Sequence, residues 1–199
     1  MKLYNHFCAS GFSNCYILAH NGDAIIIDPG SMDEVILNII EDNAYYITGI
    51  LITHGHSNHI RGINTIKRIY ETKVYSISHV IRGQKTIPLR DGEAVNIGSF
   101  RIDVIAAPGH TADSAIYRID RMLFTGDALS AGLIGRTSSV YAASNQMTAL
   151  RGKILSLPGD YVILPGHGPP TTLEAERRFN AGINNFEDYK TRRPVYKPL

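Results

Sequence analysis

The sequence lacks the features that mark several large classes of protein. Its 199 residues carry a net charge of only +2, whereas a protein that grips nucleic acid through a basic surface shows a strong excess of lysine and arginine. It also lacks an apolar run of about 18 residues, the length that a membrane-spanning helix needs. We therefore expect neither a nucleic-acid partner nor a membrane partner.

Targeting and disulfide signals are missing as well. Residues 1–6 lack the apolar core and the cleavage site of a signal peptide, which favours a cytoplasmic location. The chain has only two cysteines, Cys8 and Cys15, too few for a disulfide framework. They flank residues 9–14, which have the character of a hairpin turn. We expect them to be buried, reduced thiols on paired strands.

No repeat, linker or low-complexity segment divides the chain, and its length suits one domain over residues 1–199. Apolar runs predict strands at 14–20, 24–30, 50–52, 74–78, 94–97, 100–106, 114–119, 122–124 and 160–164. Apolar spacing predicts a helix at 32–43, and we expect further helices around 63–70, at 145–157 and, polar in character, from 172 to about 189. This order predicts sheets sandwiched between helices. The basic tail at 192–199 is expected to be solvated or packed against a partner.

The strongest chemical signal is the segment Thr53–Gly62, which follows the apolar strand 50–52 and contains His54, His56 and His59. In an extended segment, residues i and i+2 point to one side, so His54 and His56 should lie together. His59 falls where a following helix would begin. Because neutral imidazole is the commonest metal ligand in proteins, the segment predicts a metal site.

Three later loops each follow an apolar run and carry one further polar group. They place His110 in Pro-Gly-His-Thr, Asp127 in Thr-Gly-Asp and His167 in Pro-Gly-His-Gly. Ligands on loops at one edge of a rigid scaffold are a common way to build a site. The remaining histidines lack such a context and are expected to have surface or core roles: His6, His20 and His79.

This ordered set of motifs, from Ile27-Asp28-Pro29-Gly30 to Pro165-Gly166-His167-Gly168, resembles the metallo-β-lactamase superfamily. The resemblance implies an α+β fold, a four-layer αββα sandwich with the metal site along one edge of the facing sheets. It also implies the site residues, transferred one by one: His54, His56 and His110 for the first metal, His59 and His167 for the second, and Asp127 as the bridging carboxylate. Asp28 would support the site, with a capping or turn role before Pro29 as the alternative.

One position departs from the family motif, because Asn58 stands where the family has an aspartate that ligates the second metal and helps to activate the attacking water. A neutral amide cannot serve as a base, so the second site should be weakened. Three alternatives remain open: one metal held by His54, His56 and His110, two metals with a weaker second site, or a catalytically impaired paralogue. Retention of all five motif histidines favours the first two.

Further details resemble the small glyoxalase-II-like (hydroxyacylglutathione-hydrolase-like) enzymes of this superfamily. They are Gly135-Arg136-Thr137 after Gly126-Asp127, and the segment 165–172 with Glu174, Arg177 and Asn180 beyond it. We expect the chain to lack the longer helical C-terminal part that gives glyoxalase II its glutathione contacts. The implied function is hydrolysis of a small thioester, ester or lactone. Arg136 would bind an anionic substrate or, alternatively, anchor its loop through an ion pair.

The implied mechanism uses metal-bound hydroxide, since a divalent cation lowers the pKa of its water from about 15.7 towards about 7. Asp127 would hold the metals or the nucleophile, His167 would stand at the edge of the site, and Asn58 would occupy the water-activating position. One or two zinc ions are expected, and iron or manganese also suits such ligands.

The alternative function is a mononuclear-iron, persulfide-dioxygenase-like oxidoreductase, with His54, His110 and Asp127 as the iron ligands. In either case the expected partner is a small-molecule substrate. The oligomeric state stays open, with the region near Tyr189 and Tyr196 offering one surface for a dimer contact.

Overall fold

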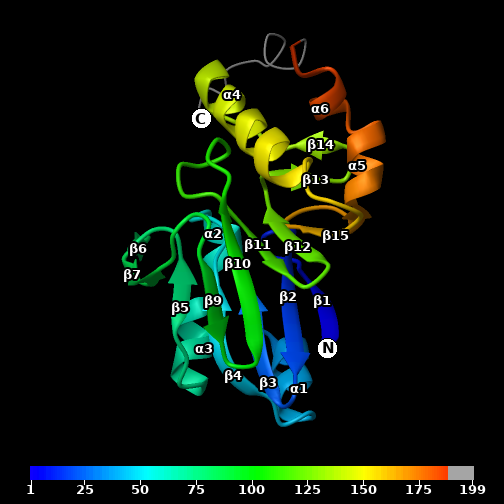
Figure 1. Ribbon diagram of the computed structural model, residues 1–199. Coiled ribbons are helices and arrows are strands. Elements are labelled where there is room, and N and C mark those ends of the chain that lie inside the picture. The colour runs from blue at the N-terminus through cyan, green and yellow to red at the C-terminus, as the bar shows by residue number, and fades with distance from the viewer. Residues whose placement is uncertain (188–199) are drawn as a thin grey trace.

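Two facing sheets form the middle of the molecule in the computed structural model, which describes residues 1–187 (Figure 1). The strand order is β1-β2-β3-β4-β5-β8 in the first sheet and β16-β15-β12-β11-β10-β9 in the second. The first sheet consists of β1 (Lys2–Cys8), β2 (Ser13–His20), β3 (Asp23–Ile27), β4 (Tyr46–Leu51), β5 (Val74–Ser76) and β8 (Ile87–Pro88). The second consists of β9 (Ala94–Ile97), β10 (Phe100–Ala106), β11 (Ala115–Ile119), β12 (Met122–Gly126), β15 (Val162–Pro165) and β16 (Thr171–Thr172).

Helices cover the outer face of each sheet. They are α1 (Glu34–Glu41), α2 (Ser57–Ile60), α3 (Ile63–Ile69), α4 (Val140–Ala149), α5 (Leu173–Phe179) and α6 (Ala181–Asn184), and α4 continues as a π-helical turn over Leu150–Ile154. Two short hairpins complete the set: β6 (Val80–Ile81) with β7 (Gln84–Lys85), and β13 (Leu129–Ser130) with β14 (Leu133–Ile134). Figure 1 shows α1 and α3 at one end of the molecule and α4, α5 and α6 at the other.

Strand β2 shows why the sheets are buried on both faces. Its side chains alternate between a core shared with α1 and α3, which includes Cys15 and Ile17, and a core between the two sheets, which includes Tyr16 and Leu18. A third core joins the second sheet to α4 and α5. The layers therefore run helix, sheet, sheet, helix, which confirms the predicted α+β four-layer sandwich.

Each predicted strand overlaps a strand of the structure, and two of them, β9 and β10, have the predicted bounds 94–97 and 100–106. The hairpin turn between β2 and β3 contains Asn21 and Gly22, both with positive φ. Cys8 and Cys15 lie on the antiparallel pair β1 and β2, and both are free and buried, as predicted.

Two helix predictions need correction. The helix predicted at 145–157 begins earlier, because the Ser139 side chain accepts a hydrogen bond from the Ala142 amide (3.1 Å) and so starts α4 at Val140. The helix predicted from 172 to about 189 is two helices, because Asn180 has an extended backbone (φ −69°, ψ 111°) and starts a new helix. The tail at 192–199 and the suggested contact near Tyr189 and Tyr196 lie outside the described residues.

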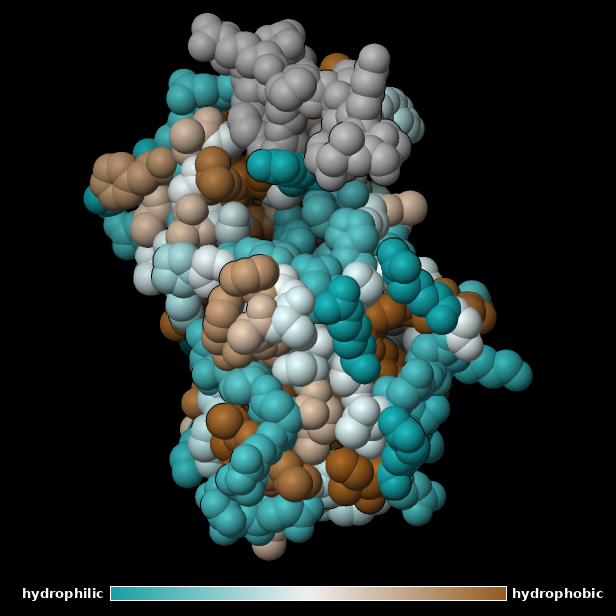
Figure 2. Space-filling view, turned by 180° about the vertical axis from the view of Figure 1, so that it is seen from behind, coloured by the Kyte–Doolittle hydropathy of each residue, from teal (hydrophilic) through white to brown (hydrophobic). Residues whose placement is uncertain are grey.

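The molecular surface is mixed in character. Seen from behind, apolar side chains form separate groups among hydrophilic ones (Figure 2). Over residues 1–187, no helix combines the length and the apolarity needed to cross a bilayer.

Asn180 offers a test of the break between α5 and α6. Its buried side chain accepts from the Ile183 amide (3.1 Å) and donates to Glu176 Oε2 (2.5 Å) and to the Ser130 carbonyl (3.3 Å). We expect Asn180→Ala to lower the free energy of unfolding by about 2–4 kcal/mol, since it removes a helix cap and leaves buried groups unpaired. Urea denaturation measures this change. The exposed Asn185→Ala should change it by less than about 0.5 kcal/mol, and equal effects would contradict the assignment.

Candidate metal centre

Side chains from three separated loops converge at one edge of the facing sheets. His54 and His56 follow β4, His110 follows β10 and Asp127 follows β12. Nδ1 of His56 lies 3.0 Å from Nε2 of His54 and 3.0 Å from Nε2 of His110. Oδ2 of Asp127 lies 3.6 Å and 3.5 Å from the same two Nε2 atoms. These four side chains, which we name the first group, can together hold a metal ion.

A second group shares Asp127 with the first. It adds His59 from α2 and His167 from the loop after β15. Nε2 of His59 lies 3.6 Å from Asp127 Oδ2, and Nδ1 of His167 lies 2.7 Å from Asp127 Oδ1. The side chain of Asn58 is turned towards this group, with Nδ2 2.9 Å from His167 Nε2. The structure thus brings together all six residues predicted as ligands, and it places Asn58 at the second group.

Hydrogen bonds behind His54 fix the proton on its ring. The Thr53 hydroxyl donates its only hydrogen to Asp28 Oδ2 (2.5 Å), so it can only accept from His54 Nδ1, 3.1 Å away. His54 therefore carries its proton on Nδ1, and the lone pair of Nε2 points into the first group. An outer acceptor that orients a ring in this way is typical of metal-binding histidines.

His110 is held in the same manner from another loop. Its Nδ1 donates to the backbone carbonyl of Arg136 (2.6 Å), which leaves a lone pair on Nε2. The lone pairs on Nε2 of His54 and Nε2 of His110 thus face one point, together with the Asp127 carboxylate. Of the three rings of the first group, only His56 can place a hydrogen there, on its Nδ1. Such an arrangement is complementary to a cation.

Asp28 adopts a backbone conformation that supports this interpretation. Its φ of 51° lies in the left-handed region, which is costly for a residue with a side chain although aspartate tolerates it better than most. In that conformation Oδ1 accepts from the Thr53 amide (2.8 Å), and Oδ2 accepts from His59 Nδ1 (3.1 Å) as well as from the Thr53 hydroxyl. One buried carboxylate therefore orients His54, through Thr53, and His59 directly.

The second group also contains a buried polar atom with no partner. Among the described residues, Nε2 of His59 has no hydrogen-bond partner although its side chain is 0% exposed. A buried nitrogen left unpaired costs free energy unless something binds it. A cation between His59 and Asp127 would satisfy it, so the residues present fit a metal in this group too.

The burial of these rings sets their protonation. Burial, together with the neighbouring His59, lowers the pKa of His54 to about 2. Burial also lowers the pKa values of His56 and His110. At neutral pH these three rings are therefore uncharged, the form that binds metal.

Charge is concentrated on the pair His59 and Asp127. Burial lowers the pKa of His59, but the carboxylates of Asp127 and Asp28 outweigh it and raise that pKa to about 10. Burial raises the pKa of Asp127, but contacts with His167 and His59 outweigh it and hold that pKa well below its usual range. Asp127 is thus an anion at the centre of the cluster.

Gly166 shows how closely the loops approach one another. A Cβ atom at this position would lie 2.4 Å from Asp127 Oδ1 and 2.6 Å from His59 Cε1. Any side chain here would push the loop that carries His167 away from Asp127. The glycine of the Pro-Gly-His-Gly motif is therefore required by the packing of the second group.

Arg136 contributes its backbone to the first group, while its side chain is exposed. Within residues 1–187 its guanidinium forms no ion pair, so the alternative of a loop-anchoring ion pair finds no support. The charge of this arginine is available to a ligand near His110.

Several residues that shape the site were not singled out from the sequence. Thr53 is one, and the position directly before the histidine motif was its only signal. Gln146, from α4, is another. Its buried side chain donates a hydrogen bond (2.7 Å) to the carbonyl of Ala128, the residue that follows Asp127. Nothing local in the sequence connects it to residue 128. Asn14, from β2, bonds the loop that carries His167.

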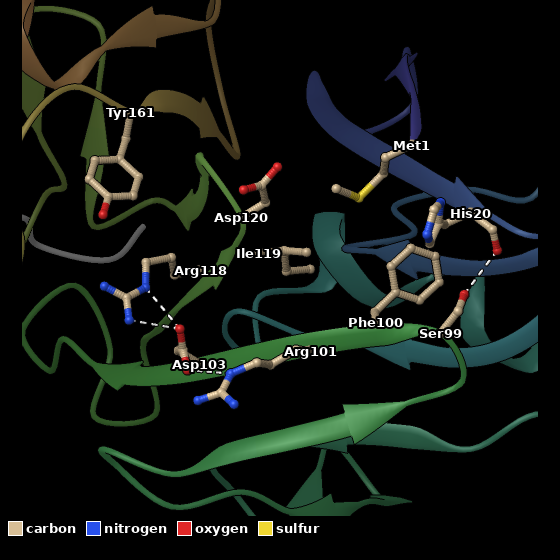
Figure 3. Close-up of a pocket in the computed structure, with 10 residues that line it drawn as sticks. All are labelled: Met1, His20, Ser99, Phe100, Arg101, Asp103, Arg118, Ile119, Asp120 and Tyr161. Atoms are coloured by element: carbon tan, nitrogen blue, oxygen red, sulfur yellow. Dashed lines mark hydrogen bonds and ion pairs between the residues drawn. The ribbon is translucent and has the colours of Figure 1, made fainter.

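A separate pocket, lined by His20 among others, lies at the ends of β10 and β11 that are opposite to the loops carrying His110 and Ser114 (Figure 3). Two of its arginines face one carboxylate: Arg118 donates to Asp103 Oδ2 through Nη2 (2.7 Å) and Nε (2.9 Å), and Nε of Arg101 lies 3.8 Å from Asp103 Oδ1. The Ser99 hydroxyl donates to the His20 carbonyl (2.9 Å). The pocket therefore lacks the converging unpaired atoms that distinguish the histidine cluster.

Comparison with known proteins agrees with this geometry. The family described as the metallo-beta-lactamase superfamily matches residues 9–167. A probable metallo-hydrolase of Bacillus subtilis, YqgX, is 29% identical, over 87% of this chain and 93% of the relative. A hydroxyacylglutathione hydrolase of Hahella chejuensis is 34% identical, over 76% of this chain and 59% of the relative. The crystal structure of ETHE1 from Myxococcus xanthus superposes with a TM-score of 0.84 and 25% identity, over 96% of this chain and 89% of that one.

Asp28 provides the test of the hydrogen bonds behind the cluster. Asp28→Asn keeps the size of the side chain but replaces one acceptor oxygen by an NH₂ donor. That donor would face the groups of Thr53 and His59 that now donate to the carboxylate. We expect the affinity for Zn²⁺ to fall about 10–100-fold, as for other residues that orient metal ligands. Competition with a chromophoric chelator measures it, and the exposed Asp42→Asn serves as the control. An unchanged affinity in Asp28→Asn would show that the rings are oriented without this carboxylate.

Proposed function

The chain belongs to the metallo-beta-lactamase superfamily, and from that premise we propose that it is a metal-dependent hydrolase of a small thioester, ester or lactone. The observation that carries the proposal is the convergence of the His54 and His110 lone pairs on the Asp127 carboxylate. Similarity to a probable metallo-hydrolase and to a hydroxyacylglutathione hydrolase supports it.

The two groups have different parts in this proposal. His54, His56 and His110 would hold a first ion, zinc by preference, and His59 and His167 would hold a second, with Asp127 available to both. Such a divalent cation supplies a Lewis acid and a bound water that is acidic near neutral pH. Asp28 and Thr53 would keep Nε2 of His54 and Nε2 of His59 directed towards such ions.

Exposure indicates where the substrate enters. The side chains of His54 and His59 are 1% and 0% exposed, whereas that of His167 is 38% exposed. The open side of the cluster is therefore the side of His167 and Asn58. A substrate carbonyl approaching from there meets these two side chains first, and the Asn58 amide can donate a hydrogen bond but cannot accept the proton of a water.

A second candidate function is the mononuclear-iron oxidoreductase. It is favoured by the neutral Asn58 amide in the second group, since such a site needs one metal only. In this case His54, His110 and Asp127 of the first group would hold the iron.

Elemental analysis and two assays separate these functions. Protein purified without chelator should contain zinc and hydrolyse thioesters, and metal removal should abolish turnover while zinc restores it. Iron in the isolated protein together with oxygen uptake on adding a persulfide would favour the oxidoreductase. Absence of bound metal, with no activity after zinc is added, would overturn both and leave the impaired paralogue.

Asn58→Asp tests the effect of the missing carboxylate. A second negative charge beside His59 and His167 should strengthen binding of the second ion and supply an acceptor for the proton of the attacking water. We expect the zinc content to approach two per chain and kcat for a thioester to rise about tenfold. Asn64→Asp, the same charge change on the exposed face of α3, is the control. Equal zinc content and equal rates in wild type and Asn58→Asp would contradict this role.

Arg136→Ala tests substrate charge. If the exposed guanidinium binds an anionic group, its loss should raise KM for an anionic thioester about tenfold, the size of one exposed charge-assisted hydrogen bond, with kcat nearly unchanged. A neutral thioester of similar size should be hydrolysed equally by both proteins. The same KM change for both substrates would mean that the arginine acts through its loop and His110.

A further inference from the structure

The first residues of β2 contact both segments that form the second group. Nδ2 of Asn14 donates to the carbonyl of Pro165 (2.9 Å) and to that of Gly168 (2.8 Å). The backbone amide of Asn14 donates to the carbonyl of Gly166 (2.8 Å). One residue of the first sheet thus binds the loop on both sides of His167.

The residue next to it holds the other segment. The buried hydroxyl of Ser13 donates to the backbone carbonyl of Asn58 (2.6 Å). The turn before β2 also packs tightly here, because a Cβ atom at Gly11 would lie 2.7 Å from Cβ of Asn58. The backbone of Asn58 is therefore fixed against the start of β2.

The geometry of a strand explains how two neighbours reach two different segments. Consecutive side chains of a strand point to opposite faces of the sheet. Ser13 therefore faces α2, which packs on the first sheet, while Asn14 faces the second sheet, where β15 ends. Between them lies the contact of 2.9 Å from Asn58 Nδ2 to His167 Nε2.

We propose that Ser13 and Asn14 are positioning residues that set the second metal group by fixing the distance between Asn58 and His167. This inference rests on the proposed metal-binding function. The first group depends on other contacts, namely the Thr53 hydroxyl behind His54 and the Arg136 carbonyl behind His110. A change at Ser13 or Asn14 should thus weaken the second ion and spare the first.

Asn14→Asp is the sharpest variant, because aspartate has the same shape but cannot donate to the Pro165 and Gly168 carbonyls. Its charge also repels these oxygens, which should displace the loop from Asp127. Ser13→Ala releases the Asn58 carbonyl by a smaller change. Tyr16→Phe is the matched control: it removes a buried hydrogen bond from the same strand to the Pro165 carbonyl (2.7 Å), yet Asn14 still binds the loop on both sides.

Titration of metal-free protein with Co²⁺, followed by its visible absorption, measures the two groups separately. It should be done in the wild type and in the Asn58→Asp background, where the second ion has a charged ligand. We expect Asn14→Asp to weaken the second ion about 10–100-fold and to leave the first within about twofold. Ser13→Ala should act in the same direction, and Tyr16→Phe should leave both within about threefold. Equal weakening of both ions, or equal effects of Asn14→Asp and Tyr16→Phe, would overturn the proposal.

A second measurement needs no metal. Imidazole nitrogen spectra of the metal-free chain report the surroundings of each ring, and Asn14→Asp should shift the His167 resonances while those of His54 and His110 keep their wild-type positions. Unshifted His167 resonances would overturn the inference. If the wild type and Asn58→Asp bind no Co²⁺ at all, the proposed function fails, and the spectra still decide whether Asn14 positions His167.

Discussion

The central constraint on this protein is the Asp127 carboxylate, around which four histidine rings must be held with their nitrogens turned inward. Oδ2 lies 3.5 or 3.6 Å from nitrogens of His54, His59 and His110, and Oδ1 lies 2.7 Å from His167. The lone pairs of His54 and His110 face one point and repel each other in the absence of a cation. The fold opposes this repulsion by fixing each ring from behind.

The supports come from different layers of the sandwich. The Asp28 carboxylate sits at the end of β3 in a left-handed conformation, so that both of its oxygens reach the neighbouring segment at Thr53 and α2. Parallel pairing of β3 with β4 brings the ends of these two strands to the same edge. In the second sheet, parallel pairing of β12 with β15 does the same for Asp127 and His167. The site is thus a consequence of two parallel strand pairs that face each other.

The sequence predicts those parts of the structure that depend on local pattern. Apolar runs bounded by turns predicted β9 and β10 to the residue, and the spacing of His54 and His56 predicted that their rings lie together. Local pattern fails where a distant side chain decides. Apolar spacing alone does not show that Asn180 ends α5, because that depends on Glu176 and on Ser130, fifty residues earlier in the chain.

The two metal-binding groups also differ in how far local sequence determines them. His54 and His56 are neighbours in the chain, and Thr53, which orients His54, precedes it directly. Both groups span the two sheets, but the second joins α2, on the first sheet, to the loop after β15 in the second, and Asn58 contributes no charge to hold these two segments together. Its geometry therefore depends on how the sheets are fastened to one another at this edge. Beside the first group, the sheets are joined by the Ala115 amide, which donates to the Thr53 carbonyl (2.8 Å). Beside the second group, they are joined by Asn14, which binds the carbonyls of Pro165 and Gly168, so a loss of these bonds would disturb the second group before the first.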